Sequence, residues 1–267
     1  MTWKQYLPNA DEKPLDRLLP DGGLCSTLRT IGCVGDSLSS GEFEEHLQDG
    51  NVLFNDMYEH SWGQYLARIC GNKVYNFSKG GMSAQEYCES FAENRGFWNP
   101  ELACEAYVIA LGVNDIINMN QPIGTKDDID FDNWRNNKPT FMGYYGQLVL
   151  RLKEISPKAK FFFVTIPKDD RGKEVEERTQ LQSVAVREMA TWFSNAYVID
   201  LNKYAPVVDA DFKKQFNLGF HMNPSGYYLM AKMMISYIDY IIRNNMDDFR
   251  ESAYICTDHK FRHENDL

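Results

Sequence analysis

The fold is decided by the stretch TIGCVGDSL, residues 30–38. An apolar, partly β-branched run that ends in Gly-Asp-Ser is typical of a buried strand that enters a tight turn. Such a turn can present the hydroxyl of Ser37 at the rim of a sheet. A serine in this place can attack an acyl carbon if other segments supply a base and hydrogen-bond donors for the oxyanion.

Mostly continuous apolar runs predict five strands, at residues 29–35, 73–77, 106–111, 160–166 and 196–200. This pattern suits parallel strands that are covered on both faces. Apolar residues at helical spacing occupy 61–70, 83–94, 140–155, 173–194 and the segment from Pro224 onward, which Asn223 can cap. The alternation predicts an α/β fold, a three-layer α/β/α sandwich with a five-stranded, mainly parallel, flavodoxin-like sheet. Ligands of such sheets bind at the carboxyl ends of the strands.

The length of 267 residues fits one large domain, which we place at 29–245 between an N-terminal arm, 1–28, and a C-terminal tail, 246–267. The net charge of −10 argues against nucleic acid or an anionic membrane as a partner, and no apolar run is long enough for a membrane helix. Six cysteines without a pairing pattern and no visible secretory signal lead us to expect a cytoplasmic protein. A signal trimmed from the chain would leave the same sequence. The oligomeric state stays open.

Four short blocks carry the residue types of an acyl-transfer site. They are Gly35–Leu38, Ser78–Ser83, Gly112–Asp115 and the segment from His221 to Tyr227. In this order and spacing, over roughly 29–245, the chain resembles the SGNH (GDSL-type) hydrolases. The resemblance implies an SGNH-hydrolase fold and an enzyme that needs no cofactor and no metal.

The resemblance also assigns roles to individual residues. Ser37 would be the nucleophile and His221 its base, because a serine hydroxyl needs a base within hydrogen-bond reach. The oxyanion would be held by the backbone N–H groups of Ser37 and Gly81 and by the side-chain amide of Asn114, with Gly80 as the alternative glycine. A glycine suits this place because only backbone then crowds the oxyanion.

One position departs from the family pattern. The family usually carries an aspartate three residues before the histidine, and Leu218 stands there. We therefore expect a Ser-His dyad whose imidazole is held by a main-chain carbonyl; an acid from elsewhere, such as Asp209 or Asp211, is the alternative. A carboxylate within hydrogen-bond distance of Nδ1 of His221 would refute the dyad.

Two long insertions, 39–60 and 116–138, flank the predicted site and mix polar with aromatic side chains. This mixture suits sugar hydroxyls and ring faces. We expect a serine esterase for short-chain O-acyl esters, O-acetyl esters in particular, of a carbohydrate or another polar alcohol. The resemblance equally permits a lipase, a lysophospholipase or a thioesterase, and a catalytically silent ligand-binding domain is the alternative from another class.

The C-terminal tail contains a weak metal-ligand pattern. Cys256, His259 and His263 have a spacing that metal sites use, but a site would need a fourth ligand and a folded cage. The surrounding residues are strongly polar, which favours a solvated surface. We therefore expect no metal.

Overall fold

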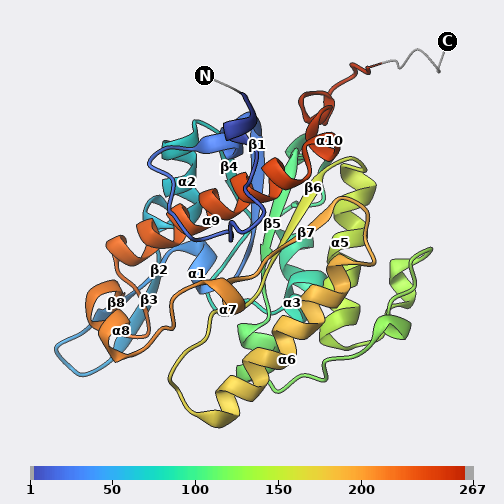
Figure 1. Cartoon of the computed structure of the whole chain (residues 1–267). Helices are drawn as coiled ribbons and strands as arrows, with labels where there is room; N and C mark the ends of the chain where they lie inside the picture. The colour runs from blue at the N-terminus through green and yellow to red at the C-terminus, as the bar shows by residue number, and fades with distance from the viewer. Residues whose placement is uncertain (1–2, 262–267) are drawn as a thin grey trace.

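The computed structural model of the chain describes residues 3–261 and is built on a central parallel sheet (Figure 1). Its strand order is β4-β1-β5-β6-β7, and all four neighbouring pairs are parallel. The strands are β1 (Thr30–Gly35), β4 (Lys73–Asn76), β5 (Ala106–Ala110), β6 (Lys160–Val164) and β7 (Ala196–Ile199). This is the flavodoxin-like order, so the predicted fold class is confirmed.

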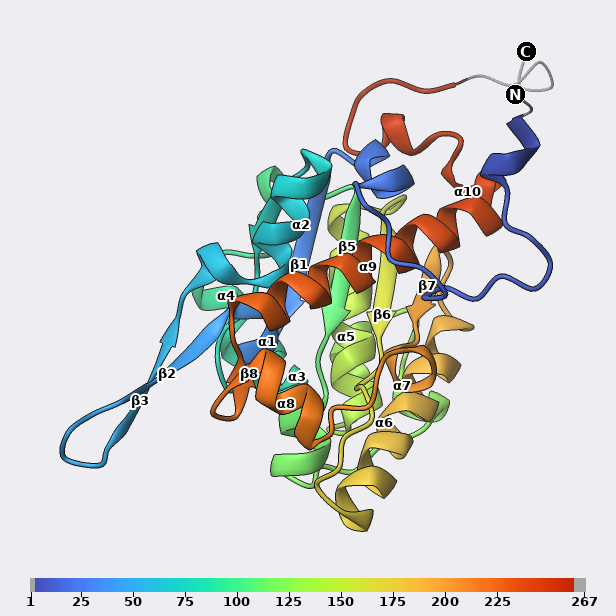
Figure 2. The same ribbon diagram turned by 60° about the vertical axis from the view of Figure 1, so that its left-hand side comes forward.

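Helices cover both faces of the sheet. α2 (Trp62–Cys70) and α9 (Pro224–Asn244) pack on one face, and α5 (Phe141–Ile155) and α6 (Lys173–Ala190) on the other. In Figure 2, α9 crosses in front of the sheet while α5 lies behind it. The shorter helices are α1 (Ser37–Ser40), α3 (Ala84–Glu86), α4 (Ala92–Asn94), α7 (Leu201–Tyr204), α8 (Ala210–Phe216) and α10 (Met246–Phe249).

The burial of β6 explains why the strands are apolar without alternation. All five of its residues are buried. Phe161 and Phe163 belong to the core under α5 and α6, whereas Phe162 and Val164 belong to the core under α9. Successive side chains of a strand point to opposite faces, so the run from residue 161 to 164 serves both cores and is apolar throughout, whereas Lys160 at the start of the strand donates to Asn195.

Two antiparallel hairpins were not predicted from the sequence. β2 (Glu42–His46) pairs with β3 (Val52–Asp56), and β8 (Asn217–Leu218) pairs with β9 (His221–Met222). The β2–β3 hairpin extends away from the body of the molecule, as Figure 2 shows. Its base packs against β9, so the two hairpins meet at the carboxyl end of the sheet.

Described parts of the N-terminal arm and of the C-terminal segment pack on the domain. In the N-terminal arm, the backbone N–H of Leu24 donates to Asp239 of α9 at 2.8 Å, and Arg243 forms ion pairs with Glu12 and Asp239. In the C-terminal segment Phe249 is buried. Within 3–261 no helix has the length and apolar character needed to cross a membrane. His263 lies outside the described residues.

Candidate active site

The candidate nucleophile begins a short helix at the end of a central strand. Ser37 is the first residue of α1, directly after β1. Asp36 caps this helix, and its carboxyl group accepts a hydrogen bond from the N–H of Leu38 at 3.1 Å. Gly41 ends the helix in the left-handed conformation, with a φ of 77°, which glycine adopts without strain. The turn therefore fixes Ser37 at the carboxyl end of the sheet.

Three N–H groups near this turn are available to an oxyanion. Within residues 3–261, neither the N–H of Ser37 nor that of Gly81 donates to a protein acceptor. The amide of Asn114 donates one hydrogen to the carbonyl of Met82 at 2.9 Å and accepts from Asn118 at 2.7 Å. Its second hydrogen is left for a ligand. The bond to Met82 also ties Asn114 to the glycine turn.

The structure favours Gly81 over Gly80 as the oxyanion glycine. The N–H of Gly80 points to the carboxylate of Asp56, at 3.4 Å. A Cβ at residue 80 would lie 1.7 Å from Oε2 of Glu42, so this glycine makes room for a carboxylate. Gly81 has a φ of 74° and open space around it, which leaves its N–H accessible.

The imidazole of His221 lies between two carboxylates. Its Nδ1 is 3.1 Å from Oε1 of Glu44, and its Nε2 is 3.1 Å from Oε1 of Glu42. The predicted dyad with a carbonyl at Nδ1 is therefore wrong. The alternative acids were also misplaced, because Asp209 caps α8 by accepting from Phe212, and Asp211 lies in the first turn of that helix.

Glu44 is held in place by a ring of donors. Its side chain is 1% exposed, and it accepts the backbone N–H groups of Phe220 and His221 as well as Nδ1. A Cβ at residue 219 would lie 2.0 Å from this carboxylate, so Gly219 allows the close approach. Burial works to raise the pKa of Glu44, but the hydrogen bonds from Phe220 and His221 outweigh it, and the pKa lies below its usual range. Glu44 is thus a carboxylate at neutral pH.

Glu42 contacts Nε2 of His221, the nitrogen through which a general base would take the proton of Ser37. In the described part of the chain no hydrogen bond joins Ser37 to His221, although α1 lies beside β9. Tyr227 of α9 ties the segments together, since its hydroxyl donates to the carbonyl of Glu42 at 2.8 Å and is 3.5 Å from that of Ser37. Burial raises the pKa of Glu42, opposed by the charge of His221 and supported by that of Asp56.

Two buried acids lie close to the nucleophile turn. Burial raises the pKa of Asp36 to about 7, against the hydrogen bond from Leu38. Burial also raises the pKa of Asp115 to about 6, against hydrogen bonds from backbone N–H groups that include that of Ala84. Asp115 joins the two loops through Ala84, at 2.8 Å, which is a structural role.

Other residues singled out in the sequence lie elsewhere. The ring of Trp134, in the second insertion, donates to Glu154 of α5 and stacks with Arg151, so it faces α5. His60 pairs with the hydroxyl of Tyr65 at 3.3 Å. Among the described side chains no group of His, Cys, Asp and Glu is arranged to hold a metal ion.

The four sequence blocks and their order agree with one family of hydrolases. The profile of the GDSL-like Lipase/Acylhydrolase family matches residues 33–229. The chain belongs to this family. Membership in the GDSL-like lipases and acylhydrolases makes it an ester-hydrolysing enzyme, as the sequence predicted. No protein with a curated description matches the sequence.

Solved structures of low sequence identity share the fold of this GDSL-like enzyme. A protein from Lactobacillus plantarum has a TM-score of 0.59 at 17% identity, over 79% of this chain and 97% of that one. A possible lipase from Chitinophaga pinensis DSM 2588 has a TM-score of 0.54 at 15% identity, over 81% of this chain and 98% of that one. A family two carbohydrate esterase from Clostridium thermocellum, in complex with cellohexaose, has a TM-score of 0.54 at 16% identity, over 82% of this chain and 65% of that one.

Proposed function

We propose that the protein is a serine esterase that hydrolyses short-chain O-acyl esters of a carbohydrate or another polar alcohol. Ser37 is the nucleophile, His221 its base, and Glu44 the acid that orients the imidazole. The observation that carries the proposal is the contact of Glu44 with Nδ1 of His221, because it supplies the orienting acid that the family's usual position, Leu218, lacks.

In the first half of the reaction an acyl-enzyme forms. Nε2 of His221 takes the proton of Ser37 while Oγ attacks the ester carbon. The negative oxygen of the tetrahedral intermediate accepts hydrogen bonds from the N–H groups of Ser37, Gly81 and Asn114, which are fixed before charge develops. The alcohol then leaves with the proton from His221.

In the second half water replaces the alcohol. His221 takes a proton from the water as it attacks the acyl carbon, and the same donors hold the oxyanion. The intermediate collapses, Ser37 regains its proton from the imidazolium, and the carboxylic acid is released. Throughout both halves Glu44 keeps Nδ1 protonated and stabilises the positive imidazole.

This course requires one movement at the start. Nε2 faces Glu42 in the resting structure, so the imidazole must exchange Glu42 for Ser37. The adjacency of α1, β2 and β9 supports a side-chain rotation rather than a rearrangement of the fold. Glu42 thus competes with Ser37 for the base.

Two observations support a polar alcohol as the leaving group. The carboxylates of Glu42 and Asp56 and the amide of Asn118 lie close to the candidate nucleophile or oxyanion groups and can bind hydroxyls. The ring of Phe54 meets His221 edge to face, with centroids 5.9 Å apart, and can cover a sugar ring. The carbohydrate esterase among the structural neighbours is consistent with this class.

A lipid ester is the second candidate, and a specific observation favours it. Leu218, Phe220 and Phe54 are 51%, 88% and 54% exposed on the two hairpins that meet at His221. Such an apolar edge could also contact the acyl or alkyl part of a lipid.

The proposal is tested by the hydrolysis of p-nitrophenyl acetate, an acetylated xylo-oligosaccharide and a lysophospholipid. We expect turnover of the first two by the wild type and none above background by Ser37→Ala or His221→Ala. Turnover of the lysophospholipid alone would assign the second candidate. No turnover of any ester would contradict the proposed activity and leave a ligand-binding domain.

A further inference from the structure

Two of the six cysteines meet where the N-terminal arm packs on the domain. Cys25 belongs to the 3-10 helix Gly23–Thr27 of the arm and is fully buried, whereas Cys70 is the last residue of α2 and is half-buried. Both are free thiols, and the thiol of Cys25 donates a hydrogen bond to the sulfur of Cys70. Two sulfur atoms that are far apart in the sequence are therefore in contact.

The backbones that carry the two thiols are also close. A Cβ at Gly22, the residue before the 3-10 helix, would lie 2.9 Å from Cα and 3.0 Å from Sγ of Cys70. Sγ of Cys70 lies 3.8 Å from the carbonyl oxygen of Gly22. The amide of Asn72 donates to the carbonyl of Cys25 at 3.1 Å. The arm and the end of α2 are thus held side by side, so rotation of the two side chains can bring the sulfur atoms to bonding distance.

Cys70 is the thiol that a reagent in solution reaches first. Its side chain is half-buried, whereas that of Cys25 is closed off from solvent. The hydrogen bond from Cys25 lowers the pKa of the Cys70 thiol, and a hydrogen bond with Ser26 acts in the same direction. Burial and the charge of Asp21 oppose this shift without cancelling it. Since the thiolate is the form that attacks a disulfide, Cys70 is suited to the first step of an exchange.

A cation without a carboxylate partner lies near the same thiol. Lys232 of α9 is 8% exposed, and its ammonium group forms no ion pair with any residue in 3–261. Buried lysines are usually paired. Its positive charge favours the thiolate form of Cys70, so the arm, α2 and α9 together form a local environment that stabilises a negative sulfur.

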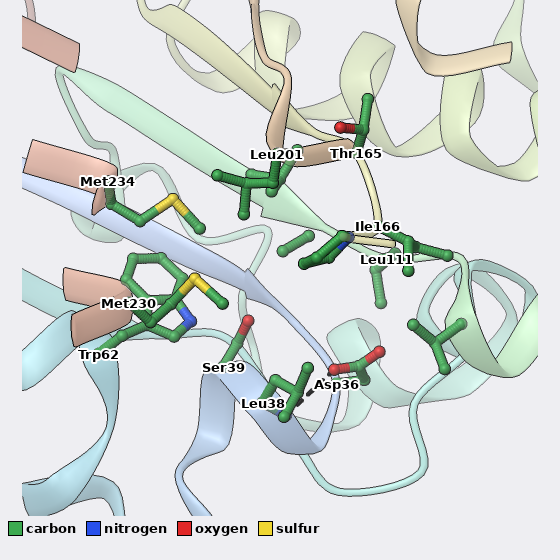
Figure 3. Close-up of a pocket in the computed structure, with 14 residues that line it drawn as sticks. Asp36, Leu38, Ser39, Trp62, Leu111, Thr165, Ile166, Leu201, Met230 and Met234 are labelled. Carbon is green, nitrogen blue, oxygen red and sulfur yellow. Dashed lines mark hydrogen bonds between the residues drawn. The ribbon is translucent and has the colours of Figure 1, made fainter. Parts of the chain in front are cut away.

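The two thiols lie at one end of a helix whose other end reaches the nucleophile turn. α2 begins at Trp62 and ends at Cys70. Figure 3 shows Trp62 near Leu38 and Ser39 of α1, and the three side chains line the same small space. A bond at Cys70 would therefore fix this supporting helix to the arm at the end that is far from Ser37.

We propose that Cys25 and Cys70 form a thiol–disulfide exchange site, which reacts with a low-molecular-weight disulfide such as oxidised glutathione and closes to a disulfide bond between the N-terminal arm and α2. The thiolate of Cys70 attacks one sulfur of the reagent, so a mixed disulfide forms and one glutathione leaves and takes up a proton. Cys25 then loses its proton and attacks the sulfur of Cys70, which releases the second glutathione. In total the protein loses two electrons and two protons, and the disulfide of the reagent becomes two thiols.

The test is incubation of the folded, full-length protein with oxidised glutathione, followed by peptide mass spectrometry without reduction. We expect one cross-link, between Cys25 and Cys70, which dithiothreitol reverses. Cys25→Ser should stop at the mixed disulfide on Cys70, whereas Cys70→Ser should leave the buried Cys25 unmodified. Cys25→Ala replaces Cys25→Ser if the latter does not fold. Cys256→Ser removes an exposed thiol elsewhere and is the matched control, which should still form the cross-link.

Thermal unfolding gives a second readout. A bond between residues 25 and 70 closes a loop of about 45 residues, so oxidation should raise the Tm of the wild type by roughly 10 °C and leave that of Cys70→Ser unchanged. Neither readout uses ester hydrolysis, so the result is independent of the proposed activity. Six free thiols after incubation, a mixed disulfide on Cys70 of the wild type that does not close, or a bond between other cysteines would overturn the inference.

Discussion

At the scale of single residues, Glu44 decides how His221 is held. It contacts Nδ1 from a strand that lies 177 residues earlier in the chain and is fixed by two backbone N–H groups. A family member without the usual aspartate can therefore still place a carboxylate behind its histidine. The acid has moved from the histidine's own loop to the β2–β3 hairpin.

Glu44→Gln tests this positioning role. Replacing the orienting acid of a serine protease by its amide lowers turnover about 10⁴-fold, and we expect a loss on the order of 10³ to 10⁴ in kcat with little change in KM. The matched control is Glu45→Gln, an exposed neighbour on the same strand, which should keep wild-type kcat. A Glu44→Gln enzyme with wild-type kcat across the pH range would show that the contact is only structural.

Glu42→Ala tests the competition for Nε2. A carboxylate cannot donate a hydrogen bond, so the contact between Glu42 and Nε2 needs a proton on one of the two groups. While Nε2 is bonded to Glu42, it cannot accept the proton of Ser37. In Glu42→Ala, Asp56 and Ser40 remain beside the space that the Glu42 side chain leaves. Glu44 still contacts Nδ1 of His221.

Removing the Glu42 carboxylate leaves Nε2 free to accept the proton of Ser37, so Glu42→Ala should raise kcat/KM for p-nitrophenyl acetate. The measurement is the steady-state kinetics of the wild type and the variant side by side. A lower kcat/KM in Glu42→Ala would mean that Glu42 assists the base instead of occupying it.

At the scale of elements, α9 begins at Pro224, three residues after His221. Asn223 caps the helix by accepting the N–H of Gly226 at 2.9 Å, and its amide donates to the carbonyl of Gln215 at 2.8 Å. The cap therefore stabilises α9 and also ties its start to the end of α8, from which the β8–β9 hairpin follows.

Asn223→Ala should lower the free energy of unfolding by about 1 to 2 kcal/mol, as the loss of an N-cap does, and lower kcat by loosening His221. Urea unfolding and ester turnover measure the two effects. Asn244→Ala, near the other end of α9, is the control and should leave kcat unchanged. Equal effects of the two substitutions would contradict a role for the cap in positioning the base.

The elements that the sequence predicted are those with a strong local pattern. The five strands appear in the sequence as apolar runs because each packs against a core on both faces. The start of α9 was predicted from the cap at Asn223 and the proline that follows it. The hairpins were not predicted because β8 and β9 have only two residues each and β3 is exposed at every position. The pairing within each hairpin is local, but the two hairpins meet through the contacts of Glu44 with His221, 177 residues apart, which no local pattern contains.

The same reason explains which site residues could be predicted. Ser37, Gly81 and Asn114 follow predicted strands that are neighbours in the sheet, so their convergence could be inferred from the fold. Glu42 and Glu44 depend on the hairpin. The alternating segment EFEEH, residues 42–46, was the one available signal, since it fits a strand with acids on one face.

At the scale of the whole molecule, the site lies at the switch point of the sheet. The chain leaves β1 for β4 on one side and returns to β5 on the other, so the ends of β1 and β5 open a crevice between them. The first insertion forms one wall of the site, while the second packs on α5.

Burying Asp36 in this crevice has a global consequence for stability. Its pKa is about 7 in the folded protein, against 3.8 ordinarily, so the folded state binds more protons and loses stability as pH rises from 4 to 7. Asp36→Asn keeps a good N-cap and removes the charge. Its free energy of unfolding should match the wild type near pH 4 and exceed it by up to about 4 kcal/mol above pH 8.

Denaturant unfolding at pH 4, 6 and 8 measures this difference. Asp209→Asn, the exposed cap of α8, is the matched control and should show no such trend. A difference between Asp36→Asn and the wild type that does not grow with pH would contradict the burial of a neutral carboxyl group.

The most direct test of the account is covalent capture of the nucleophile. A fluorophosphonate should react with an activated serine by losing fluoride and forming a phosphonyl ester, and peptide mass spectrometry locates the bond. We predict one adduct on Ser37, formed quickly in the wild type and at least 100-fold more slowly in His221→Ala. An adduct elsewhere, or none in the folded wild-type protein, would contradict the claim that Ser37 and His221 act together.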